Sequence, residues 1–234
     1  SRGLGDVYKR QVQDTPSATT PLSAVTLQQA VNMTRHKTGM SALAAYFGDQ
    51  VQVVDVGICV PVSCPQVLDR KVRFSTGDIA AEPAMTEQEA LRALSVGLDL
   101  AHMAKEEGID AVGVGEMGIG NTTTSAAVLA ALTGASVEEV AGRGGGLTDR
   151  GFATKKRVLR QALALHHPDP GDPVAVLAAV GGLDLAAMTG LFLGCAHEGL
   201  AAAVDGYISI VAALCAVRLC PRVRDYLFLS HASY

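Results

Sequence analysis

Apolar residues along the chain follow two periods, one helical and one typical of short buried strands. Val25 to Phe47 has the helical period, which is interrupted near Gly39. Further helices are expected at residues 87–107, 125–133, 152–166, 174–180, 185–197 and 209–219, with a short one after Ser136. Apolar or β-branched runs predict strands at residues 51–56, 109–115, 200–204 and 226–229. Residues 57–77 contain two proline-bearing stretches and predict an irregular excursion.

Apolar strands that alternate with helices indicate a mostly parallel sheet covered by helices, an α/β fold of the Rossmann-like three-layer type. Ligands of such sheets bind at the carboxyl ends of the strands. The loop Glu116–Thr124, the turn Asp205–Gly206 and the residues after Leu229 are therefore expected on one edge. Local signals set some boundaries: Thr86 and Glu89 have the spacing of a capping box.

The composition is that of a globular chain long enough for one large domain. Of 234 residues, 49% are hydrophobic and 18% charged. A net charge of −4 does not favour nucleic acid or an anionic membrane as a partner. Asp184, Glu198, Asp205 and Arg218 interrupt the apolar C-terminal half, so no transmembrane helix is expected. The five cysteines are odd in number and form no C-x-x-C, which argues against zinc or disulfides and favours the reducing cytoplasm.

Both ends of the chain differ from those of a complete domain. Residues 1–11, SRGLGDVYKRQ, lack an initiating Met and have no signal-peptide or transit-peptide pattern. We expect them to be a non-native lead joined to the protein. The chain stops soon after the predicted strand Tyr226–Leu229, without a closing helix. We therefore expect residues 12–234 to form one α/β domain that is incomplete at both its N- and C-terminus.

The segment GEMGIGNTTTS, residues 115–125, is similar to the phosphate-binding P-loop, but Asn121 replaces the lysine and Glu116 adds a carboxylate. These changes make a triphosphate a poor ligand. What remains is a set of backbone N–H groups before a helix, with Asn121 and three threonines, which suits one phosphate or one carboxylate. A tight strand-to-helix turn capped by threonine is the structural alternative.

Gly113-x-Gly115-x-x-Gly118 also matches the dinucleotide fingerprint, and Glu138 lies 20 residues beyond Gly118. However, Glu138 falls in a predicted helix instead of at the end of a strand. A carboxylate beside an anion site can hold ribose hydroxyls, accept a proton from a nitrogen nucleophile or stabilise a cationic sugar. These roles favour chemistry at the anomeric carbon of a nucleoside monophosphate.

GEMGIGNTTTSAAVLAALTG resembles the signature of the nicotinate-nucleotide:dimethylbenzimidazole phosphoribosyltransferase family. Other blocks resemble the family in the same order: VTLQQAVNMTRHKTGMSALAAYFG, VVDVGI, PAMTEQEA, VGGLDLAAMTGLFLG and VDGYISIVAAL. The resemblance implies a parallel sheet with a smaller helical part, a homodimer, and no metal or other cofactor. It also implies transfer of the phosphoribosyl group from nicotinate mononucleotide to 5,6-dimethylbenzimidazole, which gives nicotinate and the α-ribazole 5′-phosphate used in cobalamin assembly.

The resemblance carries specific roles to this chain. Glu116 would lie between the two substrates, Gly144 and Lys155 would hold the 5′-phosphate, and Gln28 or Gln29 would line the benzimidazole pocket. Taken alone, Lys155 and the two glutamines also read as solvated helix residues. The resemblance further implies a set of nucleotide-binding residues: Gly118, Gly120, Asn121 and Thr122.

The principal catalytic glutamate of the family, in a Gly-Glu-Gly motif, is expected beyond Tyr234 and is absent here. Glu116 would then be a secondary catalytic group. The alternatives are a nucleotide-binding fragment without turnover, a relative with another acceptor such as adenine or a phenol, and a P-loop-like ATPase or kinase.

Overall fold

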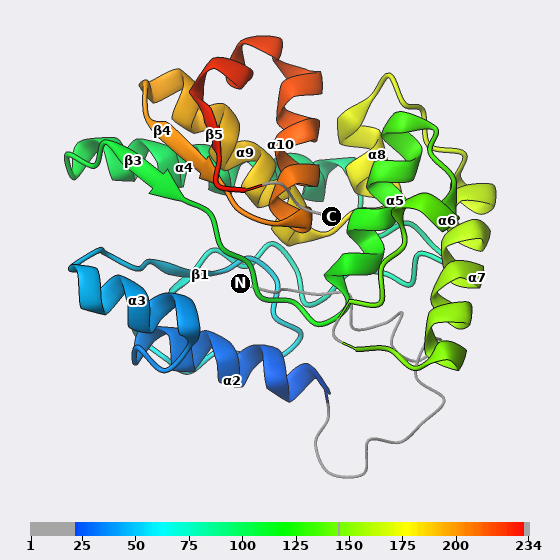
Figure 1. Cartoon of the computed structure of the whole chain (residues 1–234), viewed down its shortest axis with the longest axis horizontal. Helices are drawn as coiled ribbons and strands as arrows, with labels where there is room; N and C mark the ends of the chain where they lie inside the picture. The colour runs from blue at the N-terminus through cyan, green and yellow to red at the C-terminus, as the bar shows by residue number, and fades with distance from the viewer. Residues whose placement is uncertain (1–21, 145, 232–234) are drawn as a thin grey trace.

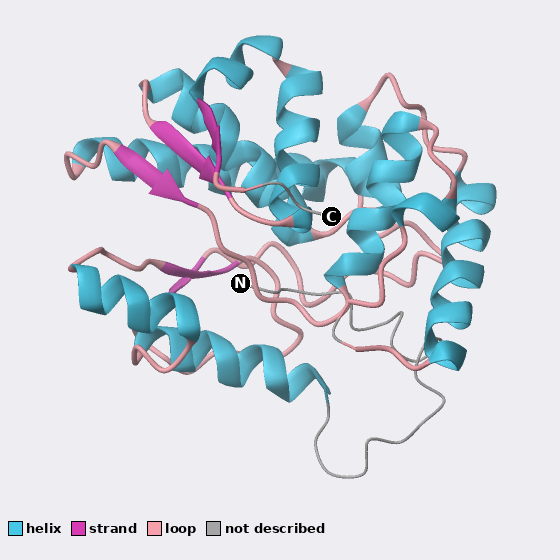
Figure 2. Ribbon diagram, viewed as in Figure 1, coloured by secondary structure: helices cyan, strands magenta, loops and turns pink. Residues whose placement is uncertain are grey.

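A computed structural model of the chain describes residues 22–144 and 146–231 (Figures 1 and 2). The expected non-native lead, residues 1–11, lies outside the described residues. In chain order the elements are α2 Leu22–Thr34, α3 Gly39–Phe47, β1 Val53–Asp55, β2 Val67–Asp69, α4 Glu87–Glu106, β3 Ala111–Gly113, α5 Asn121–Thr133, α6 Val137–Val140, α7 Asp149–His166, α8 Pro173–Val180, α9 Leu183–Glu198, β4 Ala201–Val204, α10 Tyr207–Leu219, the 3₁₀ helix η1 Pro221–Tyr226 and β5 Leu227–Leu229.

All described strand pairs are parallel, as the sequence predicted. β3, β4 and β5 form one sheet in that order, and β1 pairs with β2 in another. Two expectations were wrong: the strands do not form a single sheet, and β2 lies inside the segment predicted to be irregular. With only 3 residues, β2 is too short to show an alternation, and its partner β1 provides the pairing.

The three-stranded sheet has one buried and one exposed face within the described part of the chain. Ala202 and Val204 of β4 are fully buried in the main core, next to α9 and α10. On the opposite face Ala203 pairs with Gly113 and Phe228, and all three are exposed. Helices α9 and α10 lie beside these strands (Figures 1 and 2). The carboxyl ends of all three strands point toward the loop that follows β3 (Figure 1).

The helix pair α4 and α9 forms the most extensive contact of the core, and glycines allow it. A Cβ added at Gly97 would overlap the carbonyl oxygen of Ala187, and one added at Gly190 would overlap that of Leu94. The two backbones therefore approach too closely for any side chain at these positions. The start of α9 lies beside the start of α5, where Asn121 donates to Asp184 in the candidate site.

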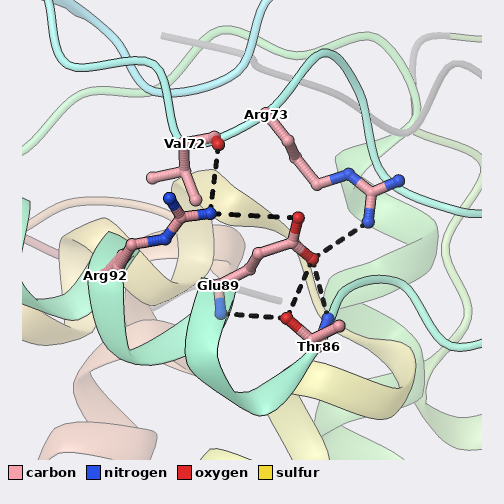
Figure 3. Close-up of polar contacts among 5 residues, drawn as sticks. All are labelled: Val72, Arg73, Thr86, Glu89 and Arg92. Atoms are coloured by element: carbon pink, nitrogen blue, oxygen red, sulfur yellow. Dashed lines mark hydrogen bonds and ion pairs between the residues drawn. The ribbon is translucent and has the colours of Figure 1, made fainter.

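The predicted capping box at the start of α4 is confirmed. The Thr86 hydroxyl accepts from the backbone N–H of Glu89, whose carboxylate accepts from the backbone N–H of Thr86 (Figure 3). Arg73 donates to the same carboxylate at 3.1 Å, and Arg92 bonds the carbonyl of Val72. Burial raises the pKa of Glu89, but the bonds from Thr86 and the charge of Arg73 outweigh it and leave that pKa below its usual range. This network attaches the segment after β2 to α4.

A second, smaller hydrophobic cluster joins helix α2 to β1 and β2. Its buried members are Ala30, Met33, Val53, Ile58 and Val67. Met117, from the loop after β3, packs against the same cluster. Helices α2 and α3 contact each other and match the smaller helical part that the resemblance implied; α2 shares this cluster with Met117 of the candidate site loop.

Most other helices match the sequence prediction, including the break between α2 and α3 and the left-handed Gly134 that ends α5. α5 differs because it begins at Asn121 instead of Ser125. Among the described residues, no helix combines the length and the apolar character needed to cross a bilayer.

Candidate functional site

The loop after β3 leads directly into the N-terminus of α5. Gly120 adopts the left-handed conformation there, with a φ of 105°, which glycine allows without strain. The backbone N–H of Asn121 donates to the carbonyl of Gly118 at 3.1 Å, and no described side chain caps the helix. A helix N-terminus without a side-chain cap offers backbone donors and the positive end of the helix dipole to an anion.

Asn121 occupies the position of the P-loop lysine, but its side chain holds two carboxylates. Its Nδ2 atom donates to Oε2 of Glu116 at 2.6 Å and to Oδ2 of Asp184 at 2.8 Å. The side-chain amide carries two hydrogens, so both of its donors are used. Asn121 is 2% exposed, and its contact with a nucleotide, expected from the resemblance, stays a prediction.

Asp184 is the buried member of this group and is 2% exposed. Its Oδ1 atom accepts the backbone N–H of Leu185 at 2.9 Å, near the start of α9. Burial raises the pKa of Asp184 to about 7; the hydrogen bond from Asn121 opposes this rise and the charge of Glu116 adds to it. A Cβ added at Gly182 would lie 2.5 Å from Asp184 Oδ1, so glycine is needed where α9 begins.

Lys155 of α7 reaches the same end of α5 from the other side. Its Nζ atom donates to Oγ1 of Thr122 at 2.9 Å and to the carbonyl of Gly142 at 2.8 Å. The residue is fully buried, and this burial lowers the pKa of Lys155 to about 8. Within residues 22–144 and 146–231, no carboxylate forms an ion pair with this ammonium group.

The glycine turn before α7 lies against the same hydroxyl group. Gly144 has a φ of 56°, and a Cβ added there would lie 2.7 Å from Oγ1 of Thr122. The structure therefore brings together Thr122, Gly144 and Lys155, three residues that the family resemblance assigned to the nucleotide. Lys155 is buried, so the alternative of a solvated helix residue is wrong.

Helix α2 forms the wall of the loop on the side of the small cluster. The hydroxyl of Thr26, which is 2% exposed, accepts the backbone N–H of Ile119 at 3.5 Å. Gln28 is exposed and Gln29 is half-buried on the same helix. Their place in a base pocket stays a prediction.

Two polar residues of this site were missed by sequence reasoning. Asp184 was treated only as an interruption of an apolar segment, and Thr26 was not singled out. A lone carboxylate after two glycines, in an otherwise apolar helix, was the available signal for Asp184. Its partners lie 63 and 68 residues away, which local patterns do not show.

The other expected positions on this edge lie at the ends of β4 and β5. Asp205 follows β4, and its Oδ1 atom lies 3.8 Å from Nδ1 of His231. Among the described residues, no group of three or more His, Cys, Asp or Glu is placed to hold a metal ion. A surface cavity of about 400 Å³ lies elsewhere, where α4 and α8 begin and α7 ends, and none of its lining residues belongs to the site described above.

Comparison with known proteins places these observations in context. A family model described as "Phosphoribosyltransferase" matches residues 6–234. A nicotinate-nucleotide–dimethylbenzimidazole phosphoribosyltransferase from Geobacter sulfurreducens is 51% identical over 210 residues, which are 89% of this chain and 60% of that protein. A protein of the same name from Ruminiclostridium cellulolyticum is 42% identical over 90% of this chain and 60% of its own length.

A crystal structure of CobT from Thermus thermophilus superposes with a TM-score of 0.88 and 36% sequence identity. The superposition covers 99% of this chain and 70% of that one. The likeness extends over the whole described fold. The chain spans about 60% of the length of the curated relatives it matches.

Proposed function

The chain belongs to the nicotinate-nucleotide:dimethylbenzimidazole phosphoribosyltransferase family, and we propose that it carries the phosphoribosyl-transfer site of that family. In this reaction the bond from the anomeric carbon to the nitrogen of nicotinate breaks. A bond from that carbon to a ring nitrogen of 5,6-dimethylbenzimidazole forms, with inversion from β to α. The products are nicotinate and α-ribazole 5′-phosphate, and the benzimidazole loses one proton to a base.

The observation that carries the proposal is the meeting of a buried ammonium group and a pair of carboxylates at the N-terminus of α5. Lys155 reaches Thr122, and Glu116 reaches Asn121, the preceding residue. A nucleoside monophosphate has an anionic phosphate at one end and a sugar that becomes cationic in the transition state at the other. The ammonium group of Lys155 has the opposite charge to the phosphate, and the carboxylate of Glu116 has the opposite charge to the cationic sugar.

In our proposal the 5′-phosphate binds at Lys155, Thr122 and Gly144. The phosphate supplies the negative charge that the buried ammonium group lacks, and the end of α5 adds backbone donors. Gly118 and Gly120 shape the loop so that its backbone approaches the nucleotide closely. The site therefore does not need the P-loop lysine, because Lys155 of α7 supplies the cation.

Glu116 is proposed to lie between the ribose and the incoming base. Its carboxylate can stabilise positive charge on the ribose ring and can accept the proton that the benzimidazole loses. The leaving nicotinate is a pyridinium before the bond breaks, so departure needs no general acid. The reaction as proposed uses no metal and no other cofactor.

The acceptor base is proposed to bind on the side of α2. Met117 and the small cluster supply an apolar wall, and Gln28 or Gln29 supplies a polar contact. The resemblance to the family also supports a homodimer and a cytoplasmic location. The principal catalytic glutamate is expected beyond Tyr234, so Glu116 is a secondary group in this proposal.

The test is to incubate the chain with nicotinate mononucleotide and 5,6-dimethylbenzimidazole and to follow both products by chromatography. A second protein carries, after Tyr234, the remaining C-terminal residues of the Geobacter sulfurreducens relative. We expect α-ribazole 5′-phosphate from the extended protein and much less, or none, from the chain itself. If neither protein forms product or binds nicotinate mononucleotide, the proposal is wrong.

Two further experiments test the alternatives. Adenine or a phenol in place of the benzimidazole measures the choice of acceptor. Stabilisation of the fold by ATP and Mg²⁺, but not by nicotinate mononucleotide, would support a P-loop-like enzyme instead.

A further inference from the structure

The two carboxylates bound to Asn121 differ in how firmly they are held. Both oxygens of Asp184 are used, Oδ1 by the backbone N–H of Leu185 and Oδ2 by Asn121. The residue is 2% exposed and lies in the first turn of α9, a helix that packs closely against α4. Asp184 is therefore the rigid end of the group.

Glu116 is the adjustable end. It is half-buried and lies on the loop between β3 and α5, outside any helix or strand. A glutamate on a loop has several rotamers, and a hydrogen bond from a fixed donor favours one of them. The amide of Asn121, at 2.6 Å from Oε2, is that donor.

The orientation of the Asn121 amide is fixed by its hydrogen bond to the buried Asp184. A side-chain amide can rotate by half a turn and present its oxygen where its nitrogen was. At a pH above the pKa of Asp184, which burial raises to about 7, the oxygen would then face the ionised Asp184 carboxylate, which is unfavourable because an ionised carboxylate only accepts hydrogen bonds. Asp184 thus holds the nitrogen toward Glu116.

We infer that Asp184 is a positioning residue for phosphoribosyl transfer, which acts through the Asn121 amide to hold the Glu116 carboxylate in one orientation at the substrate site. This inference rests on the proposed function, because it needs Glu116 to act in the transfer. Asp184 itself touches no substrate in this account. Its effect on the reaction passes entirely through Glu116.

The hydrogen-bond linkage is tested without substrate by the side-chain ¹⁵N–¹H signals of Asn121, assigned through an Asn121→Ser variant. At pH 8.5 we expect both amide protons to shift in Asp184→Ala and, to a smaller degree, in Asp184→Asn. The matched control is Asp172→Ala, which removes an aspartate that accepts backbone N–H groups at the start of α8. Signals that stay in place in both Asp184 variants would overturn the linkage.

The role in transfer is tested by a double-variant cycle on the chain and on its C-terminally extended form. With Glu116 present, Asp184→Ala should lower kcat by about tenfold to a hundredfold, the loss typical of a misplaced reacting group. The KM for nicotinate mononucleotide should change much less, and Asp184→Asn should recover part of kcat. In the Glu116→Ala background, Asp184→Ala should have almost no further effect.

Equal losses of kcat in both backgrounds would show that Asp184 acts independently of Glu116, and the inference would be wrong. Thermal unfolding of each variant identifies any that fail to fold, and the Asp184→Asn variant, which keeps the shape, then decides the cycle. The absence of turnover in every protein, wild type included, would instead refute the proposed function. The Asn121 signals would still decide the linkage.

Discussion

The ammonium group of Lys155 lies 2.9 Å from the hydroxyl of Thr122, fully buried at the N-terminus of α5. A buried cation is costly unless an anion or several acceptors surround it. Here its described acceptors are one hydroxyl and the carbonyl of Gly142. A phosphate bound beside Lys155 and Thr122 would supply the counter-charge, and its binding can be tested.

Binding of nicotinate mononucleotide should be accompanied by proton uptake. The pKa of Lys155 is lowered to about 8 by burial, so at pH 8.5 most of the free protein holds the neutral amine. A phosphate beside the amine favours the charged form and raises its pKa. Titration calorimetry at pH 8.5 in two buffers with different ionisation enthalpies should show uptake of a fraction of a proton. Proton release, or heats that do not depend on the buffer, would contradict the assignment.

Gly144→Ala should weaken nucleotide binding more than Gly146→Ala. Both glycines have positive φ, 56° and 93°, so alanine is strained at either position. Only at Gly144 would the added Cβ meet Thr122 Oγ1, at 2.7 Å, whereas at Gly146 nothing lies within 4 Å. We expect at least a tenfold loss of affinity for Gly144→Ala relative to Gly146→Ala, a difference of about 1.4 kcal/mol. Equal affinities would show that the glycine turn does not shape the phosphate site.

Gly97→Ala should destabilise the fold severely. The new methyl group would overlap the backbone of α9 at Ala187, which can move only if the two helices separate. Overpacking of this kind costs about 1–3 kcal/mol, and more where backbone is displaced. Urea unfolding measures the loss. Gly39→Ala, at the first position of α3 with nothing within 4 Å, is the control and should be neutral or slightly stabilising.

Features of the fold that depend on a few neighbouring residues were predicted from the sequence. The spacing of Thr86 and Glu89 was enough to locate the start of α4, because a capping box forms within four residues. Gly134 ended α5 for a similarly local reason. Features that depend on distant partners were not predicted. β2 exists because β1 pairs with it. α5 begins at Asn121, and most of the polar segment NTTTS is buried in this helix instead of forming a loop.

In the candidate site, too, local features were predicted from the sequence and contacts between distant residues were not. The motif itself indicated an anion site with a carboxylate, and the family resemblance added Gly144 and Lys155. The structure then showed that Thr122, Gly144 and Lys155 meet. Asp184 was not predicted, because its proposed role depends on Asn121 and Glu116, which are distant in sequence and meet it only where the starts of α5 and α9 come together in the fold.

The most direct test of a nucleotide-phosphate site at Lys155 compares two ligands and two proteins by calorimetry. The ligands are nicotinate mononucleotide and the riboside that lacks its phosphate; the proteins are the wild-type chain and Lys155→Met, which keeps most of the length of the side chain but removes its charge. Charge-assisted hydrogen bonds contribute about 1.5–3 kcal/mol, so the wild-type chain should prefer the nucleotide by about tenfold to a hundredfold. Lys155→Met should lose most of that preference while it binds the riboside as before. A wild-type chain that binds both ligands equally, or a variant that keeps the full preference, would contradict the account.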